Sequence, residues 1–347
     1  MKNIWLLIVL CRLTLSCKND KKTASDIFSY VPENAAVIIK TNSLESLKSS
    51  IHSNSLIQEL LDFNQIQDLK KKLKPISFLK PESECLISLS KDQNDSLEIS
   101  FITNFKTSVF ELDSIPNLIS EKFISKNNSI SRLDINNSIF YSSIKDSVLF
   151  VSNRLQLVED SFERKRFDPE AEQLLNISSN NKSVSTLINL KQNMFNPFFF
   201  KDSTLNELQF SNYVLLDADI SQNDIIFNGI TKATDSSKSL INIYKTSIPQ
   251  ENKIAKVIPF DSDYFLSFTF NDIKNFEEHL SKQKVSDSLV EDLQPFETII
   301  EVGLVEKENK RALILQSIDP TATLENFPLN SHSVFRSVNI YNWENPE

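Results

Sequence analysis

The sequence predicts an α+β fold in which antiparallel strands pack against helices, arranged as two related halves. Three patterns indicate this class: short apolar runs paired around polar turns, amphipathic stretches with apolar residues three and four apart, and a series of elements that occurs twice. Forty per cent of the 347 residues are hydrophobic and 24% are charged, as is typical of a globular protein.

The first series consists of a turn, an apolar strand, a helix and a hairpin. Asn42 can cap the helix together with Glu45 three residues on. Apolar side chains at positions 44, 47 and 51 then share one helical face. The predicted elements are the turn 31–34, the strand 35–40, helical segments from 44 to 72, and the strands 85–90 and 97–104.

A second series has the same order and begins at the turn 258–261. After the strand 264–270, Asn271 can cap a helix whose apolar positions 273, 276 and 280 share one face. These positions follow those of the first helix at a constant offset of 229. A hairpin, 302–305 and 311–318, completes the series. Sequence identity between the two series is low, so chance similarity of common motifs is the alternative to an internal repeat.

Between the two series the pattern predicts further strands and helices. Residues 112–123 have the apolar spacing of a short helix. The other elements are a meander at 131–135, 139–144 and 147–152, a helix through 155–162, a strand at 184–190, and a hairpin at 213–220 and 225–233. Residues 334–341 could begin another meander; either the second half is shorter, or this chain is the first part of a longer protein.

Glycine occurs only twice, at Gly229 and Gly303, where average usage of about 7% would give roughly two dozen. A phosphate-binding loop needs several glycines close together, because its backbone N–H groups must close around the phosphate. The composition therefore excludes P-loop nucleotidases, Rossmann dinucleotide enzymes and hydrolases with a G-x-S-x-G elbow.

The N-terminus predicts an export signal followed by a lipid anchor. The apolar run 4–10 is too short for a bilayer span, which needs about 20 residues. Its continuation at 13–17, Leu-Thr-Leu-Ser-Cys, resembles a bacterial lipobox, in which the cysteine thiol is acylated. We therefore predict a signal peptide at 1–16, lipidation with palmitate at Cys17 and a flexible tether at 17–26. The alternative is a buried N-terminal helix whose cysteine is incidental.

Cleavage would remove two basic residues and leave 35 basic and 46 acidic residues, a net charge of −11. Such a surface repels nucleic-acid phosphates and anionic lipid head groups. We therefore expect no nucleic-acid partner, and attachment to the membrane through the acyl chains. Cys85 would be the remaining free thiol; it lies in a predicted strand and is expected to be a small core residue.

The N-terminal segment leads into Phe-Ser-Tyr-Val-Pro-Glu-Asn at 28–34 and the strand that follows. Together these residues resemble an uncharacterised family of flavobacterial (Bacteroidetes) lipoproteins, in which a proline turn enters a strand and then a helix. The resemblance implies an outer-membrane lipoprotein of the cell envelope, on the periplasmic face or at the cell surface. Some members carry the automatic name ribonuclease HII. The residues do not support that activity, because two-metal nucleases need several converging carboxylates.

The sequence predicts no catalytic residue, no metal ligand and no cofactor. His52, His279 and His332 lack the spacing of a zinc site. Asp217 and Asp219 alternate along a predicted strand, so they could form an acid pair or a solvated face. We expect a non-catalytic binding or scaffolding module for an unknown envelope protein or glycan; the alternative is an envelope hydrolase. Beyond the signal and tether, the predicted domains are a first α+β unit at 27–250 and a second, incomplete unit at 251–347.

Two further features point to contacts or modification. The aromatic segment 194–200 could form a partner-binding patch or fill the core between the halves; its phenylalanines are Phe195, Phe198, Phe199 and Phe200. Asp-Ser followed by a small or aliphatic residue resembles the O-glycosylation motif of Bacteroidetes envelope proteins. It occurs at Ser96, Ser114, Ser147, Ser203 and Ser288.

Overall fold

The computed structural model divides the chain into two compact units. The first comprises the chain up to Asn196 together with the hairpin Tyr213–Lys232, and the second comprises Pro197–Asn212 and Ala233–Glu347. Of residues 233–250, which the sequence pattern places in the first unit, those that the structure describes fall in the second unit. The structure describes residues 26–343, apart from 62–63, 107–114, 116–117, 136–137, 164–166, 179–181, 193–209, 235–238, 284–296, 309, 327–328 and 336–337.

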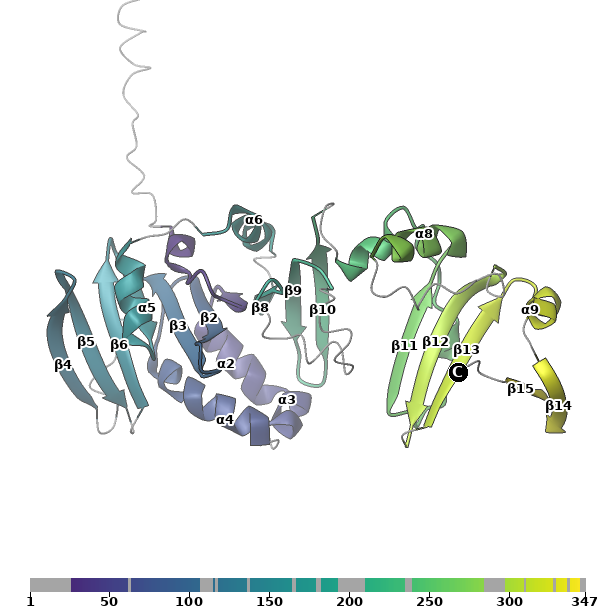
Figure 1. The fold of residues 1–347 in the computed structure, drawn as a ribbon. Helices are drawn as coiled ribbons and strands as arrows, with labels where there is room; N and C mark the ends of the chain where they lie inside the picture. The colour runs from purple at the N-terminus through teal and green to yellow at the C-terminus, as the bar shows by residue number, and fades with distance from the viewer. Residues whose placement is uncertain are drawn as a thin grey trace, which may run out of the picture. The chain divides into compact units, whose positions relative to one another are not determined.

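The first unit is built on a ten-stranded sheet in which every pairing is antiparallel (Figure 1). The strand order is β10-β9-β8-β1-β2-β3-β7-β6-β5-β4. This confirms the predicted α+β class. The strands are β1 Val37–Thr41, β2 Cys85–Lys91, β3 Leu97–Asn104, β4 Ile119–Ser125, β5 Asn128–Ile135, β6 Ser138–Lys145, β7 Val148–Ser152, β8 Val184–Asn189, β9 Tyr213–Ile220 and β10 Ile225–Lys232.

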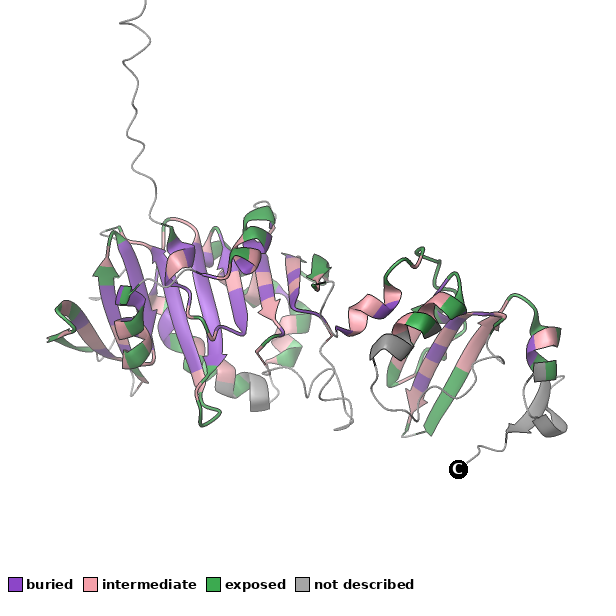
Figure 2. Ribbon diagram, turned by 45° about the horizontal axis from the view of Figure 1, so that its top comes forward, coloured by how far each residue is buried: buried purple, intermediate pink, exposed green. Residues whose placement is uncertain are grey.

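Helices cover both faces of this sheet. The central strands β2, β3 and β7 are therefore buried almost throughout (Figure 2). Residues of α2 and η2 pack on one face, and residues of η1, α5, η4 and α6 pack on the other. The helices are η1 Ile27–Tyr30, α2 Leu44–Ser53, α3 Ser55–Leu60, α4 Asn64–Leu73, η2 Lys74–Phe78, α5 Leu155–Asp160, η4 Ser161–Glu163 and α6 Pro169–Ile177.

Successive residues of a strand point to opposite faces, and β1 shows how this supplies both cores. Ile38 packs with the core beneath η1 and α6, while Val37 packs with the core beneath α2. The run of consecutive apolar residues in β1 therefore reflects burial on two sides, which is unusual for an antiparallel sheet.

The second unit contains a three-stranded antiparallel sheet, β11-β12-β13, and a separate hairpin, β14-β15. Phe270, Ile273 and Ile299 form its small core, with Phe276 of α8 packed against them. Its strands are β11 Tyr264–Thr269, β12 Ile299–Lys307, β13 Lys310–Ser317, β14 Leu329–Phe335 and β15 Val338–Trp343. Its helices are η7 Leu240–Tyr244, η8 Ile254–Lys256, α8 Ile273–Gln283 and α9 Pro320–Asn326.

The predicted series of turn, strand, helix and hairpin occurs in both units. In each, a short 3-10 helix and a proline turn precede the first strand, a helix follows it, and that strand pairs with the first strand of the next hairpin. The first unit thus has β1-α2-β2-β3 where the second has β11-α8-β12-β13.

The predicted helix at 112–123 is wrong where the structure describes it, because residues 119–125 form the edge strand β4. Ile119 and Phe123 are four residues apart, which imitates a helical face. The hairpin to β5 decides the outcome: Lys126 and Asn127 both have positive φ, 46° and 62°, as a tight two-residue turn of type I′ requires.

The predicted helix caps are each one residue too early. The Ser43 hydroxyl, not Asn42, accepts the N–H of Ser46 at the start of α2. At α8 the carboxylate of Asp272 accepts the N–H of Lys274, and Asn271 instead accepts from Ile248. The Ser, Asp and Asn side chains are near-equal caps, so the pattern alone could not choose between neighbours.

Candidate functional site

Most of the predicted site residues lie outside the described part of the chain. These are the lipidation site Cys17, the serines Ser114, Ser203 and Ser288, and the aromatic residues Phe195, Phe198, Phe199 and Phe200. The signal peptide 1–16 and the tether up to residue 25 are outside it as well. Their roles stay predictions.

The two remaining predicted glycosylation serines are exposed and lie in hairpin turns. Ser96 follows Asp95, which has a φ of 62°, in the turn between β2 and β3. Ser147 itself has a φ of 64° in the turn between β6 and β7. Both hydroxyl-bearing residues therefore occupy sharp, solvent-facing bends.

The two aspartates of β9 share a face but have separate partners. Asp217 accepts a hydrogen bond from Ser185 at 2.5 Å, and Asp219 pairs with Lys182 at 2.9 Å. Among the residues that the structure describes, no group of three or more His, Cys, Asp or Glu side chains could hold a metal ion.

The Cys85 side chain is fully buried in β2, as its place in an apolar strand predicts for a small core residue. Burial raises the pKa of its thiol to about 12, and the nearby Glu84 adds to the shift. Since the thiolate is the nucleophilic form, this cysteine is inert in the folded chain.

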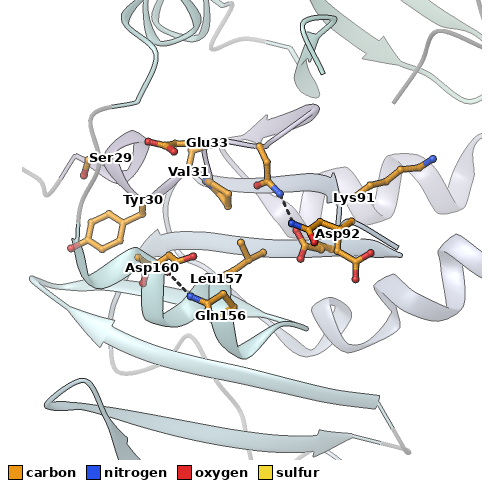
Figure 3. A pocket seen from close by; sticks show the side chains of 14 residues that line it. Ser29, Tyr30, Val31, Glu33, Lys91, Asp92, Gln156, Leu157 and Asp160 are labelled. Atoms are coloured by element: carbon orange, nitrogen blue, oxygen red, sulfur yellow. Dashed lines mark hydrogen bonds between the residues drawn. The ribbon is translucent and has the colours of Figure 1, made fainter. Parts of the chain in front are cut away.

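The larger of two neighbouring cavities opens beside the turn that precedes β1 (Figure 3). Its volume is about 590 Å³. The turn supplies one wall with Val31 and Glu33, and α5 supplies another with Gln156, Leu157 and Asp160. The turn between β2 and β3 closes a third side. Segments more than a hundred residues apart in the sequence thus meet around one space.

Glu98 on β3 fixes the inner end of this first cavity. Its Oε2 accepts hydrogen bonds from Asn34 at 3.0 Å and from Ser90 at 3.1 Å. Its Oε1 lies 4.0 Å from Nε of Arg154. Only 9% of the residue is exposed. The hydrogen bond from Asn34 ties the turn to the sheet, so the wall formed by the turn is held in place.

Asp92 forms a second fixed carboxylate in the first cavity. Its Oδ1 accepts the N–H groups of Ser96 at 2.9 Å and Asn94 at 2.8 Å, and its Oδ2 accepts from Arg154. These backbone hydrogen bonds and the guanidinium lower the pKa of Asp92, so it stays ionised at neutral pH.

The second cavity lies on the other side of the same turn and has a volume of about 380 Å³. Pro32 and Glu33 line both cavities. The apolar part of its wall comes from Pro32, Ala35, Ile38, Phe167, Pro169 and Ala171. The turn is therefore a partition with an acidic space on one side and a mainly apolar space on the other.

Asp168, Lys191 and Tyr213 form the polar corner of the second cavity. The Tyr213 hydroxyl donates to Oδ2 of Asp168 at 2.5 Å and accepts from Nζ of Lys191 at 3.1 Å. Nζ of Lys191 also lies 3.2 Å from Oδ2 of Asp168. The other carboxylate oxygen accepts the N–H of Glu170 and so caps α6.

This polar corner moves two pKa values in opposite directions. Burial alone would raise the pKa of Asp168, but hydrogen bonds from Tyr213, from the N–H of Glu170 and from Lys191 outweigh it and lower the pKa. Burial, and then the hydrogen bond to Asp168, raises the pKa of Tyr213. The pair is therefore a carboxylate and a neutral phenol at all moderate pH values.

Neither cavity was predicted from the sequence. The turn at 31–34, the hairpin at 85–104 and the helix at 155–162 are each recognisable in the sequence, but no sequence pattern shows that they meet. Helix α6 was not predicted either, although Asp168 followed by Pro169 is a usable start signal: a capping carboxylate before a proline at the first helical position.

Comparison with known proteins identifies no family for this chain. No protein-family model matches the chain, and no curated protein matches it. A solved structure, crystal form IV of TP0453, is similar with a TM-score of 0.34 and 14% sequence identity, covering 59% of this chain and 80% of that one. No helix in the described ranges is both long and apolar enough to cross a membrane.

Proposed function

We propose that this chain is a lipoprotein of the cell envelope, anchored through Cys17, whose folded part is a non-catalytic binding module. The lipobox-like segment at 13–17 supports the anchor. The pair of cavities beside the turn at 30–34 supports a binding role. They are of the size at which proteins enclose small ligands or side chains, roughly 300–1,000 Å³.

The observation that favours binding over catalysis is the direction of the pKa shifts around the cavities. A general acid or base works best with a pKa near the operating pH. Asp92 and Asp168 have lowered pKa values, and Tyr213 has a raised one. All three pKa values are displaced away from neutrality, which argues against these three side chains as a general acid or base at neutral pH.

Metabolic labelling with radioactive palmitate, with and without globomycin, tests the anchor. We expect label on the wild-type chain and accumulation of the unprocessed precursor under globomycin. Cys17→Ala should remove the label, because acylation requires that thiol. Cys11→Ala is the matched control, since it changes a cysteine inside the same N-terminal segment and should leave labelling intact. Unlabelled wild type, or label that persists in Cys17→Ala, would overturn the anchor.

A further inference from the structure

We propose that the free edge of β10 is an interaction surface at which a second copy of this chain pairs antiparallel, about a two-fold axis at Asn228. β10 is the last strand of the ten-stranded sheet (Figure 1), and within the described part of the chain it pairs only with β9. It lines neither of the two cavities. The proposal therefore stands independently of the binding site and of the lipid anchor.

The edge of β10 is apolar and exposed. Ile226 and Phe227 are each 58% exposed, and Ile230 is 46% exposed. From Ile225 to Thr231 the strand has no charged residue and no proline. An exposed edge strand of this composition is a template for pairing with another chain, because its outward N–H and C=O groups have no strand to bond to.

The opposite edge of the same sheet has a different composition. The middle of β4 carries Glu121 and Lys122, and both side chains are exposed. Charged side chains on an edge strand oppose pairing with another chain. The two ends of one sheet therefore differ, and β10 is the end that lacks this protection.

The side chains of β10 complement those of a second β10. A two-fold axis perpendicular to the sheet continues each face into the second copy, so residues that lie opposite each other must belong to the same face. With the axis at Asn228, Ile226 lies opposite Ile230 of the second copy, and Phe227 lies opposite its Gly229. Aliphatic pairs stabilise neighbouring strands, and an aromatic ring over a glycine covers the space where a side chain is missing.

The neighbouring registers lose this match. An axis at Phe227 would place Ile226 opposite Asn228 of the second copy. An axis at Gly229 would place Ile226 opposite Lys232. Either shift replaces the aliphatic pair by a contact between an isoleucine and a polar side chain, so the register centred on Asn228 is favoured.

The proposed interface is small and its energy comes from the apolar pairs. Its two ends place Asp224 opposite Lys232 of the second copy. Lys232 already pairs with Glu170 at 3.3 Å, so this contact only avoids repulsion between like charges. An edge of eight residues is at the low end of interface sizes, and we expect a weak dimer with a dissociation constant of about 1–100 µM.

Cysteine cross-linking in cells that express the full chain tests the register. Asn228→Cys lies on the proposed axis, where the two Cα atoms would be about 4.5–5.5 Å apart, within the range of a disulfide. Mild oxidation with copper phenanthroline should therefore give a covalent dimer on a non-reducing gel, above the background that wild type sets. Thr231→Cys is the matched control: it is also exposed on β10, but its two copies would be about 20 Å apart and should not cross-link.

Paired charges test the side-chain contacts in the Asn228→Cys chain. Adding Ile226→Lys and Ile230→Lys puts like charges opposite each other twice and should lower cross-linking at least about tenfold. Ile119→Lys with Ile124→Lys is the matched control, because it adds the same charge at exposed isoleucines of β4 and should leave cross-linking unchanged. Co-expression with a chain of different length that carries Ile226→Glu and Ile230→Glu should restore a mixed dimer, because opposite charges then face each other.

Four results would overturn the proposal. Equal cross-linking of Thr231→Cys and Asn228→Cys would show random collision, and no dimer above the wild-type background would show that the edge does not pair with itself. A disulfide from Asn228→Cys to a different protein, in place of the dimer, would assign the edge to another partner. A loss for the β4 lysine variant as large as that for the β10 lysine variant would show that the dimer responds only to net charge.

Discussion

Asp168 shows how one side chain can hold three elements together. It caps α6 through the N–H of Glu170, accepts the hydroxyl of Tyr213 on β9, and pairs with Lys191 just after β8. At the other end of α6, the buried ammonium of Lys40 on β1 donates to the carbonyl of Leu175 at 3.0 Å. Charges of the favourable sign thus lie at both ends of this helix.

Replacing Asp168 by asparagine tests this role through the pH dependence of stability. The folded-state pKa of Asp168 is lowered, so its contribution is present above the pKa of the unfolded chain and is lost as pH falls through the folded value. We expect Asp168→Asn to lower the free energy of unfolding by about 0.5–1.5 kcal/mol at pH 7. The difference from wild type should shrink below about pH 4.

Urea unfolding at a series of pH values measures this difference. Asp219→Asn is the matched control, because it makes the same change at an exposed ion pair with Lys182; it should cost under about 1 kcal/mol. A loss for Asp168→Asn that stays constant from pH 7 to pH 3 would show that the carboxylate charge contributes nothing.

Contacts between single residues also explain why the cavities could not be predicted from the sequence. The sequence shows a proline turn, a polar hairpin turn and an amphipathic helix, each of which is recognisable locally. That Glu98 would meet Asn34, sixty-four residues away, depends on the order of strands in the sheet. Local patterns do not carry that order, since β3 could pair with other strands and keep the same hydrophobic periodicity.

At the scale of elements, strand prediction succeeded where an apolar run is bounded by polar turns. The observed β3 and β9 have the predicted bounds, because their apolar runs end at polar turns. The failure at β4 comes from its place at the sheet edge: only two of its seven residues are even half-buried. At this edge strand the spacing of Ile119 and Phe123 suggests a helical period, and the tight turn to β5 determines the structure instead.

Because glycine is scarce, the positions with positive φ are occupied by other residue types. Positive φ angles fall on Asp, Asn, Lys, Ser, Thr and Glu residues, while neither glycine has one. Gly229 and Gly303 instead permit close approach between chain segments. A Cβ on Gly229 would lie 2.0 Å from the carbonyl oxygen of Leu215 on β9, and one on Gly303 would lie 2.7 Å from Cγ2 of Ile254.

We therefore expect Gly229→Ala to destabilise the first unit by about 1–3 kcal/mol, the usual cost of forcing extra volume into a tight site. The obstacle is backbone, which cannot rotate away, so β10 must shift from β9. Thr231→Ala, on the same strand at an exposed position, should change stability by less than about 0.5 kcal/mol. Thermal unfolding midpoints of the two variants measure these losses. An unchanged midpoint for Gly229→Ala would mean that β10 does not approach the Leu215 carbonyl closely in solution.

At the scale of the whole molecule, the sheets of the two units contain corresponding rows of apolar side chains that differ in their exposure to solvent. Val37, Leu89 and Ile99 are neighbours across β1, β2 and β3, and each is at most 9% exposed. By order and register, the corresponding row of the second sheet is Leu266, Leu304 and Leu313. There Leu266 is 38% and Leu313 is 47% exposed.

Replacing one large aliphatic residue by alanine should therefore reduce stability by different amounts in the two rows. Ile99→Ala should cost about 2–5 kcal/mol, because it leaves a cavity beneath α2 and η2. Leu313→Ala should cost less than about 1 kcal/mol, since much of the side chain already contacts water. Urea unfolding of the full chain with each variant measures both losses. If Leu313→Ala proves as costly as Ile99→Ala, the second row is covered in solution by another part of the chain or by a second copy, and the two units are more alike than their exposed surfaces imply.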